Sequence, residues 1–302
     1  MKIVFLDSRY ITPGDLSWSE IEQYGDLEVY MSSTPEEGLA RAADADIVLV
    51  DKFVMDRNAI ESMPNLKMIA VAATGYNQVD LEAASERGIA VANVPAYSTD
   101  AVAQHTFALI LGIANHVSRL DRMIADEGWT EARASVYSTN PITLLAGKSI
   151  GIVGYGNIGS KVGEIAEAFG MRVNIYSRNR QAAVSSDFVS LHCPLNKNTA
   201  KLVNREFISE MKDGAYLINT SRGGLVDEDA LHDALVSGKL AGAGLDVVAD
   251  EPAPYDPVIH LPNVLMTPHI AFAPKETRAS IIRICGENIG AFLEGRNNNR
   301  IV

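Results

Sequence analysis

Arg222 is a candidate for binding a carboxylate group. It comes shortly after the end of a predicted strand, Ala215–Asn219, and two glycines follow it. Ligands of open α/β sheets bind at the carboxyl ends of the strands, and the planar guanidinium group matches a carboxylate with two hydrogen bonds. A surface ion pair is the structural alternative, but the two glycines at a strand end favour the binding role.

His269 and Glu251 are candidates for acid–base chemistry. Imidazole titrates near neutral pH, so His269 can donate or accept a proton, and a carboxylate such as Glu251 can orient the ring and stabilise its charged form. Each residue also has a structural alternative when it is taken alone. A single histidine is more often structural, and Glu251 beside Pro252 can be an ordinary loop carboxylate.

Three glycines at the spacing G-x-G-x-x-G predict a dinucleotide site. They are Gly154, Gly156 and Gly159, with a short apolar run from Ser149 before them and a helical run to Phe169 after them. In such a unit the first glycine allows a sharp turn, the second lets the backbone approach a pyrophosphate, and the third lets the helix pack on the strand. The free N–H groups and dipole of the helix favour the negative charge. The glycine pattern alone is weak evidence, and the flanking strand and helix strengthen it.

The pattern of elements around these residues predicts two α/β domains with parallel sheets. Strands and helices alternate up to about Val94 and again from Ser149, and the later strands are apolar throughout, as expected where helices cover both faces of a sheet. A helix is predicted from Ser98 to about Ile124 as a link between the domains. A last helix, predicted from Pro274 to Leu293, returns the chain to the first domain, which predicts a ligand cleft between the two.

Composition excludes several classes of protein. The 302 residues carry a formal net charge of −12 without a long run of Lys or Arg, so nucleic acid is not an expected partner. Cys193 and Cys285 are too few for a disulfide framework and lack metal-ligand spacing, which fits a cytoplasmic protein without a metal. The sequence has no apolar signal core and no apolar run long enough to cross a bilayer, so no membrane contact is expected.

Nearly the whole chain resembles the D-2-hydroxyacid dehydrogenase family. The resemblance rests on several motifs in one order: AATGYNQVD at 72–80, GIAVANVP at 88–95, VAQH at 102–105, the turn at Gly154, SLHCPL at 190–195, NTSRGG at 219–224, GLD at 244–246, Glu251-Pro252 and TPH at 267–269. The segments at 74–76, 102–107 and 268–272 are most similar to the glycerate dehydrogenase, or hydroxypyruvate reductase, branch.

The resemblance implies a fold of two Rossmann-like domains. A smaller flavodoxin-like domain at 1–97 and 273–302 would bind the substrate, and a doubly wound parallel-sheet domain at 98–272 would bind the dinucleotide. The implied reaction is hydride transfer between NAD(P)H and a small 2-oxo or D-2-hydroxy acid, for which hydroxypyruvate and glyoxylate are the expected examples.

The resemblance also implies roles for individual residues. Arg222, Glu251 and His269 match the catalytic positions of the family, with Arg222 on the substrate carboxylate, His269 exchanging the proton and Glu251 orienting it. Asp246 resembles the residue that meets the nicotinamide carboxamide, and a strand-end cap is its structural alternative. His105 is interpreted as a packing or cofactor-lining residue.

Further residues are predicted as contacts rather than as catalysts. The expected substrate contacts, besides Arg222 and His269, are Thr74, Gly75 and Tyr76, whose loop offers backbone N–H groups. The expected cofactor contacts are Gly154, Gly156, Asn157, Ile158, Gly159, Ser177, Arg178, His192, Cys193, Pro194, Thr199, Thr220, Ser221, Asp246 and Ala271.

Two features depart from the family pattern. The second strand of the dinucleotide domain ends in YSRNR at 176–180, without the acid that binds a ribose 2′-hydroxyl in NAD-specific domains. Ser177 with Arg178, and Arg180 as a further candidate, suit a 2′-phosphate, so NADP(H) is favoured; NAD(H), with the arginines in solvent, is the alternative.

Only nine positions separate Ser177 from Ser186, where the family has a further helix and strand. Since a parallel crossover takes about a dozen residues or more, we expect omitted residues near 180–183 rather than a sheet that has lost a unit.

Three alternative functions stay open. The side chains expected near the substrate are neutral except for Lys52, which favours a small unphosphorylated acid over the substrate of a phosphoglycerate dehydrogenase, and no C-terminal regulatory domain is apparent. Tyr97 and Phe272 could instead line a pocket for a bulky 2-oxo acid. In a different class, the chain would be a dinucleotide-sensing, corepressor-like binding protein.

The segment from Glu127 to Pro141 resembles the dimerisation region of the family, so a homodimer is expected.

Overall fold

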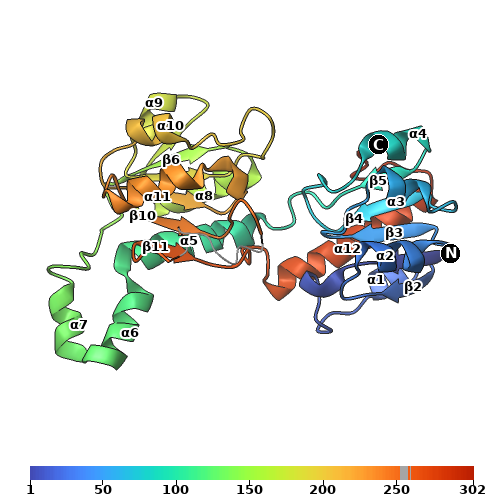
Figure 1. The fold of residues 1–302 in the computed structure, drawn as a ribbon, viewed down its shortest axis with the longest axis horizontal. Helices are drawn as coiled ribbons and strands as arrows, with labels where there is room; N and C mark the ends of the chain where they lie inside the picture. Colours follow the sequence, from blue (N-terminus) through green and yellow to red (C-terminus); the bar gives the residue numbers. More distant parts are fainter. Residues whose placement is uncertain (252–257, 259) are drawn as a thin grey trace. The chain divides into compact units, whose positions relative to one another are not determined.

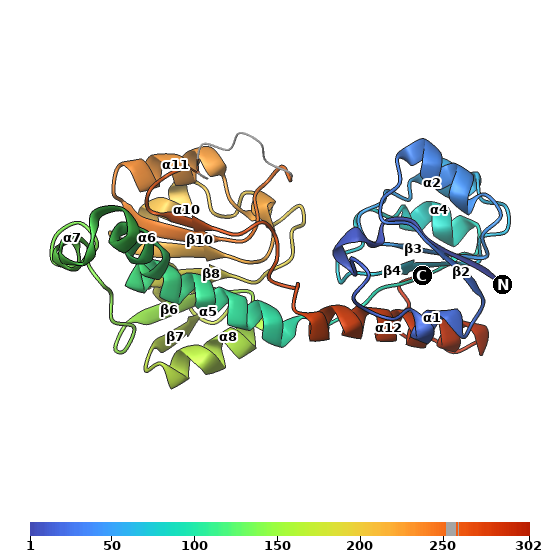
Figure 2. The ribbon, with the colours of Figure 1, turned by 90° about the horizontal axis from the view of Figure 1, so that it is seen from below.

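The chain forms two compact α/β units. The structure is a computed structural model that describes residues 1–251, 258 and 260–302. One unit holds Met1–Ser98 and Phe272–Val302, and the other holds Thr99–Ala271. Figures 1 and 2 show that each unit is a parallel sheet with helices on both of its faces. The predicted fold class, two parallel-sheet α/β domains, is confirmed.

The first unit has a five-stranded sheet in the order β2-β1-β3-β4-β5, which is the flavodoxin-like order. Its strands are β1 (Lys2–Phe5), β2 (Asp26–Val29), β3 (Ile47–Val50), β4 (Met68–Val71) and β5 (Ala90–Ala92). Its helices are α1 (Ser19–Glu22), α2 (Pro35–Ala42), α3 (Arg57–Glu61), α4 (Leu81–Glu86) and α12 (Lys275–Leu293), with a 3-10 turn η1 at Ser8–Tyr10.

Successive residues of the central strands of this sheet enter two different cores. Ile3 and Phe5 of β1 pack with residues of α12, such as Ile281, whereas Val4 packs with Ile60 and its neighbours on the other face. Because both faces are buried, these strands are apolar along their whole length. The sequence pattern therefore predicted them closely.

The second unit has a six-stranded parallel sheet in the order β11-β10-β9-β8-β6-β7. Its strands are β6 (Ser149–Val153), β7 (Arg172–Ile175), β8 (Phe188–Leu191), β9 (Ala215–Asn219), β10 (Leu240–Leu245) and β11 (Val264–Met266). Its helices are α5 (Thr99–Asn115), α6 (Val117–Glu127), α7 (Trp129–Ser135), α8 (Asn157–Ala168), α9 (Arg180–Val184), α10 (Arg205–Glu210) and α11 (Glu228–Val236), with a 3-10 turn η2 at Gly223–Leu225.

Helices cover both faces of the second sheet as well. Ile110 of α5 and Val162 of α8 join the core on one face, and Phe207 of α10 and Leu231 of α11 join the core on the other. Asn or Asp side chains cap α9, α10 and α11 by accepting a backbone N–H in the first turn of each helix. Among the described helices, none is both long enough and apolar enough to cross a membrane.

The predicted continuous helix from Ser98 to about Ile124 is wrong at one residue. His116 adopts left-handed backbone angles, with φ of 52°, and separates α5 from α6. This conformation ends an α-helix, and the apolar periodicity on both sides of His116 concealed the break. Within the second unit, α6 and α7 form a hairpin that stands off from the sheet layers (Figure 1), and α6 buries none of its residues.

The short segment after β7 closes without additional residues. This segment connects β7 to β8, which lie on opposite sides of β6, and α9 is the helix within it. The order of the sheet is therefore the doubly wound order without the strand that would lie beyond β7. The expectation that residues are omitted near 180–183 rested on the need for a full crossover unit, and a five-residue helix meets that need.

Individual residues of this segment fit the short crossover. A Cβ atom on Gly151 of β6 would overlap the carbonyl group of Ala183, so α9 lies directly on the strand backbone at that point. The Asn174 side chain donates hydrogen bonds to the Ala182 carbonyl oxygen (3.1 Å) and to Ser186 Oγ (3.0 Å). The close approach therefore depends on a glycine in β6 and an asparagine in β7.

We predict that Gly151→Ala lowers the free energy of unfolding by about 1–3 kcal/mol, because the added methyl group must push α9 off the sheet. Chemical denaturation followed by circular dichroism measures the change. Gly156→Ala is the control: the described residues have no heavy atom within 4 Å of a Cβ at that position, so stability is retained. Equal stability of Gly151→Ala and the wild type would contradict this packing.

Candidate active site

The strands of the second sheet end in register along one row. Pairing aligns Ile152 with Ile175 and, one residue further, Val153 with Leu191; Leu191 is level with Asn219, and Leu245 with both Asn219 and Met266. The segments that follow this row leave the sheet at its carboxyl edge, where ligands bind in this kind of fold. Most of the predicted site residues of this unit lie in the first few positions after the row: Gly154, Gly156, Ser177, Arg178, His192, Cys193, Pro194, Thr220, Ser221, Arg222, Asp246, Glu251, His269 and Ala271.

His269 and Glu251 are hydrogen-bonded to each other. The distance from His269 Nδ1 to Glu251 Oε2 is 2.7 Å, and both side chains are partly exposed. An ionised carboxylate only accepts hydrogen bonds, so Nδ1 carries the proton of this bond. The pair has the geometry of an oriented acid–base histidine, with Nε2 as the nitrogen that can exchange a proton.

The backbone of His269 has a strained conformation that neighbouring groups stabilise. Its φ is 53°, in the left-handed region. The His269 N–H donates to the Asp246 carbonyl oxygen (2.8 Å). The Asp246 carboxylate accepts from Thr267 Oγ1 (2.6 Å), Ile270 N (2.9 Å) and Ala271 N (2.9 Å), so it binds the loop on both sides of His269.

Asp246 is an ionised group in the interior of this unit. Its side chain is almost fully buried. Burial alone would raise the pKa of the carboxyl group, but hydrogen bonds from His105, Thr267 and the two loop amides outweigh it and lower the pKa below its ordinary value. The structure thus gives Asp246 a definite role in shaping the loop, and its predicted contact with the nicotinamide stays a prediction.

The loop after β9 is held by its own side chains. Asn219 Nδ2 donates to the Arg222 carbonyl oxygen (2.8 Å), the Ser221 N–H donates to Asn219 Oδ1 (3.0 Å), and Ser221 Oγ donates to the Cys193 carbonyl oxygen (2.8 Å). The Arg222 side chain is exposed, with one guanidinium N–H on the Ser221 carbonyl oxygen at 2.8 Å. A Cβ on Gly223 would overlap Val248, so the glycine after Arg222 allows the loops after β9 and β10 to touch.

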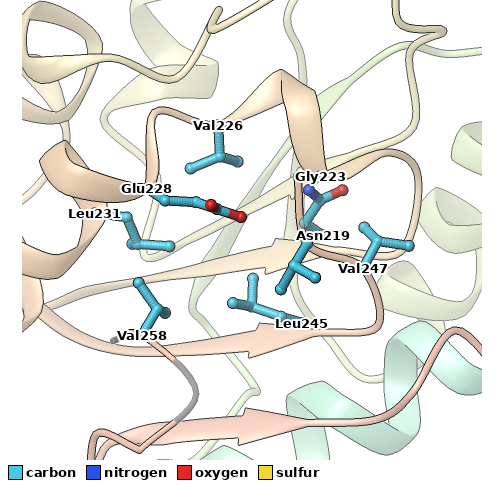
Figure 3. A pocket seen from close by; sticks show the side chains of 9 residues that line it. Asn219, Gly223, Val226, Glu228, Leu231, Leu245, Val247 and Val258 are labelled. Carbon is cyan, nitrogen blue, oxygen red and sulfur yellow. The ribbon is translucent and has the colours of Figure 1, made fainter. Parts of the chain in front are cut away.

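A small cavity lies behind these loops. It measures about 10 Å³, room for about one water molecule, and is therefore too small for a substrate. Figure 3 shows the Glu228 side chain pointing into it. Glu228 Oε1 accepts the Ala249 N–H at 2.7 Å, which fixes the segment that leads to Glu251. The cavity is lined by Asn219, Gly223, Val226, Glu228, Leu231, Leu245, Val247, Val248 and Val258.

The glycine turn fits a pyrophosphate group. Gly154 has φ of 95° and lies against the backbone of His192 and Cys193, and a Cβ on Gly159 would overlap the Gly154 carbonyl oxygen. The predicted turn and packing roles of these two glycines are thus confirmed. At Gly156 the described residues leave open space, and none of their side chains caps the N-terminus of α8. The first N–H groups of α8 can therefore bind an anion.

The other predicted cofactor residues have different surroundings. Burial away from water lowers the pKa of the His192 imidazole to about 4, so this histidine is neutral at neutral pH. A neutral ring is what a packing or cofactor-lining role requires. Thr199 Oγ1 donates to the Pro194 carbonyl oxygen (2.7 Å). Ser177 and Arg178 are exposed in the turn after β7, and the Arg178 guanidinium lies 5.7 Å from the centre of the Tyr155 ring, in the glycine turn.

Arg180 is bound within the protein. Its guanidinium group forms two hydrogen bonds with the Glu210 carboxylate and one with Tyr176 Oη (3.2 Å), and it lies over the Phe207 ring. The ion pair raises the pKa of Arg180 and lowers that of Glu210. Arg180 joins α9 to α10, so Arg178 is the stronger of the two predicted phosphate contacts.

The predicted substrate residues of the first unit follow β4. Thr74 Oγ1 donates to the Val94 carbonyl oxygen and Asn93 Nδ2 donates to the Thr74 carbonyl oxygen, both at 2.8 Å, while the Tyr76 side chain is exposed. Lys52, after β3, donates its backbone N–H to Asp7, a half-buried carboxylate that also accepts from Asp51 N and Phe53 N. The loop of Thr74, Gly75 and Tyr76 is thus anchored within its own unit.

Comparison with known proteins identifies the family. The sequence of residues 107–271 matches the protein-family model for the D-isomer specific 2-hydroxyacid dehydrogenase, NAD binding domain. The chain therefore belongs to the D-isomer specific 2-hydroxyacid dehydrogenases. Its function is that of an NAD(P)-dependent oxidoreductase that moves a hydride between 2-oxo and 2-hydroxy acids, as the sequence predicts.

Individual relatives of the chain are similar over almost its whole length. A hydroxypyruvate reductase of Blautia hydrogenotrophica is 42% identical, with 98% of each chain covered, and a glycerate dehydrogenase of Methylorubrum extorquens is 35% identical, with 99% of this chain and 98% of that one covered. The chain also resembles a solved structure, an acyclic imino acid reductase in complex with NADPH and D-Arg. The two sequences are 32% identical, and the two structures superpose over 100% of both chains with a TM-score of 0.88. The predicted branch of the family is confirmed at this level of similarity.

Several residues of the site were not singled out from the sequence. Glu228 binds the backbone N–H of Ala249, and Glu210 forms an ion pair with Arg180. Both partners are distant in the sequence, and neither glutamate lies in a motif that predicts such a contact. His105 was noted, and Thr267 was part of the TPH motif, but the contact between them was not predicted. The signal was present in part, because Asp246 and Thr267 each lie near the carboxyl end of a predicted strand.

Proposed function

We propose that this protein reduces hydroxypyruvate to D-glycerate, or glyoxylate to glycolate, with NADPH as the favoured cofactor. The observation that carries the proposal is the His269–Glu251 pair at 2.7 Å. Glu251 follows β10, which lies between β9, the strand before Arg222, and β11, the strand before His269. Hydroxypyruvate reductase and glycerate dehydrogenase relatives of nearly equal length support the choice of substrate.

Each of the three side chains has a role that its surroundings support. The reduced nicotinamide supplies the hydride to the carbonyl carbon when it is bound. Arg222, exposed and with a fixed backbone, binds the substrate carboxylate. His269 donates the proton from Nε2 to the carbonyl oxygen, and Glu251 stabilises the imidazolium form through Nδ1. In the oxidation direction His269 accepts the proton instead.

The proposed substrate is small and unphosphorylated. Thr74, Gly75 and Tyr76 are proposed to offer backbone N–H groups to its carboxylate, and these residues carry no charge. A phosphorylated substrate would need cations besides Arg222, and Lys52, at the end of a strand, is the nearby candidate that the sequence offers. A bulky 2-oxo acid is the second candidate, since Tyr97 and Phe272 are aromatic.

The cofactor preference rests on the turn after β7. Ser177 and Arg178 are exposed there, and no carboxylate stands among the residues from Tyr176 to Arg180. A 2′-phosphate would pair with the Arg178 guanidinium, whose position beside Tyr155 brings it to the glycine turn. The NADPH complex of the related imino acid reductase is consistent with this choice.

We also propose that two copies associate through the hairpin of α6 and α7. Large apolar side chains are exposed along this segment and just beyond it, and an exposed apolar surface of this kind is typical of a protein interface. They are Val117, Ile124, Trp129, Tyr137, Ile142 and Leu144.

The cytoplasm is the proposed location, because both cysteines are free and buried.

A panel of 2-oxo acids tests the substrate. We expect the highest kcat/KM with hydroxypyruvate or glyoxylate, compared with 2-oxoisocaproate, phenylpyruvate and 3-phosphohydroxypyruvate, each assayed with NADPH. A clear preference for a bulky or phosphorylated acid would overturn the substrate proposal. His269→Ala is the control for the chemistry, and its turnover should fall by about two to four orders of magnitude while cofactor affinity is kept.

A second prediction concerns the cofactor. The wild type should have the higher kcat/KM with NADPH, and Ser177→Asp combined with Arg178→Ala should reverse the preference, because a carboxylate binds a ribose diol and repels a phosphate. Arg180→Ala is the matched control. Since Glu210 already binds this arginine, its removal should lower stability and leave the cofactor preference unchanged. A wild type that prefers NADH would contradict the assignment.

A third prediction concerns assembly. Light scattering should return about 65 kDa, twice the 32.6 kDa of the chain. Trp129→Asp combined with Leu144→Asp should lower the mass to that of one chain, since charged groups replace the apolar side chains of the proposed interface. A wild type that elutes as a single chain at micromolar concentration argues against the dimer.

A further inference from the structure

His105 projects from α5 toward the loop that carries His269. Its Nε2 atom lies 2.8 Å from Thr267 Oγ1 and 3.4 Å from Asp246 Oδ1, and its side chain is mostly buried. All three residues belong to the second unit. The histidine thus contacts the two groups that shape the loop, without being part of the loop itself.

The direction of these hydrogen bonds follows from the chemistry of the groups. The Asp246 carboxylate has a lowered pKa and is ionised at neutral pH, so it only accepts. Thr267 Oγ1, at 2.6 Å from Asp246, therefore donates its single proton to the carboxylate. The threonine oxygen has only lone pairs left for His105, so Nε2 of the histidine is the donor. The bonds run from His105 to Thr267 to Asp246.

This chain of hydrogen bonds ends at the backbone of the strained residue. Asp246 uses its remaining lone pairs for Ile270 N and Ala271 N, which follow His269, and Thr267 precedes it. The left-handed conformation of His269 is unfavourable for a residue with a side chain, so it persists only where neighbouring groups impose it. His105 fixes the position of the Thr267 hydroxyl, and through it one side of this loop.

We propose that His105 is a positioning residue that holds His269 in place for proton exchange. The inference rests on the proposed catalytic role of His269. His105 does not exchange the proton itself, because its Nε2 proton is engaged by Thr267. Its neighbour on α5 has a parallel contact: Thr106 Oγ1 lies 2.9 Å from Thr220 Oγ1, two residues before Arg222. One turn of α5 therefore supports both catalytic loops.

The test compares two replacements of the histidine. His105→Leu removes the donor, and kcat should fall about 10- to 100-fold, because a small displacement of a catalytic group has an effect of this size. His105→Gln places an amide N–H at the same number of bonds from the backbone, and its kcat should stay within about threefold of the wild type. Cofactor affinity, measured by fluorescence of bound NADPH, should be unchanged in both variants.

A kinetic isotope effect separates positioning from a loss of folded enzyme. With deuterated reduced cofactor, the primary isotope effect on kcat should be larger in His105→Leu than in the wild type, because the chemical step has become slower relative to the other steps. A smaller folded fraction would lower the apparent kcat and leave the isotope effect unchanged. A folded His105→Leu variant with normal kcat and a normal isotope effect overturns the proposal.

A double-mutant cycle tests the route through Thr267. Thr267→Val removes the hydroxyl group with little change in volume, and kcat should fall at least as far as in His105→Leu. In the Thr267→Val background, His105→Leu should cause a smaller loss than in the wild-type background, since the 2.8 Å hydrogen bond that joins the two side chains is already absent. Additive losses would overturn the proposal, and so would normal turnover of Thr267→Val. The latter test holds even if His105→Leu does not fold.

The wild-type assay separates this proposal from the proposed function. If the wild type reduces none of the five 2-oxo acids with either cofactor, the proposed function fails. If the wild type is active and His269→Ala is not, the role of His269 stands. Only the behaviour of His105 and Thr267 variants then decides whether His105 positions it.

Discussion

The register of six parallel strands is the constraint on which the site depends. Val153, Leu191, Asn219, Leu245 and Met266 end their strands at one level, so segments from distant parts of the sequence start side by side. Parallel pairing fixes this arrangement before any side chain of the site is considered. It brings the glycine turn, Arg222, Asp246 and His269 to a single edge.

Strand ends alone do not set the orientation of a side chain, and here a buried charge does. An ionised carboxylate inside a protein is stable only with several donors around it. Asp246 obtains them from Thr267 and from the amides of Ile270 and Ala271, which lie on the two sides of the strained turn at His269. Asp246 and its donors thus hold the loop of His269 in its strained conformation.

The sequence predicted the parts of the site that depend on local pattern. Apolar strands, the spacing of the three glycines, and the positions of Arg222 and His269 after strands are all visible in short windows. The break at His116 was not visible, because a left-handed residue leaves the apolar periodicity of α5 and α6 intact. The contacts of Glu228 with Ala249 and of His105 with Thr267 depend on tertiary packing between distant segments, which no local pattern encodes.

The short crossover after β7 constrains the residues around it. With β7 at the edge of the sheet, α9 has five residues in which to turn back across β6, and it reaches the strand only because Gly151 has no side chain. Such a short helix has little core of its own, so the Arg180–Glu210 ion pair and the stacking on Phe207 tie it to α10. Arg180 is thereby committed to the fold, which leaves Arg178 as the cation of this turn that is available to a ligand.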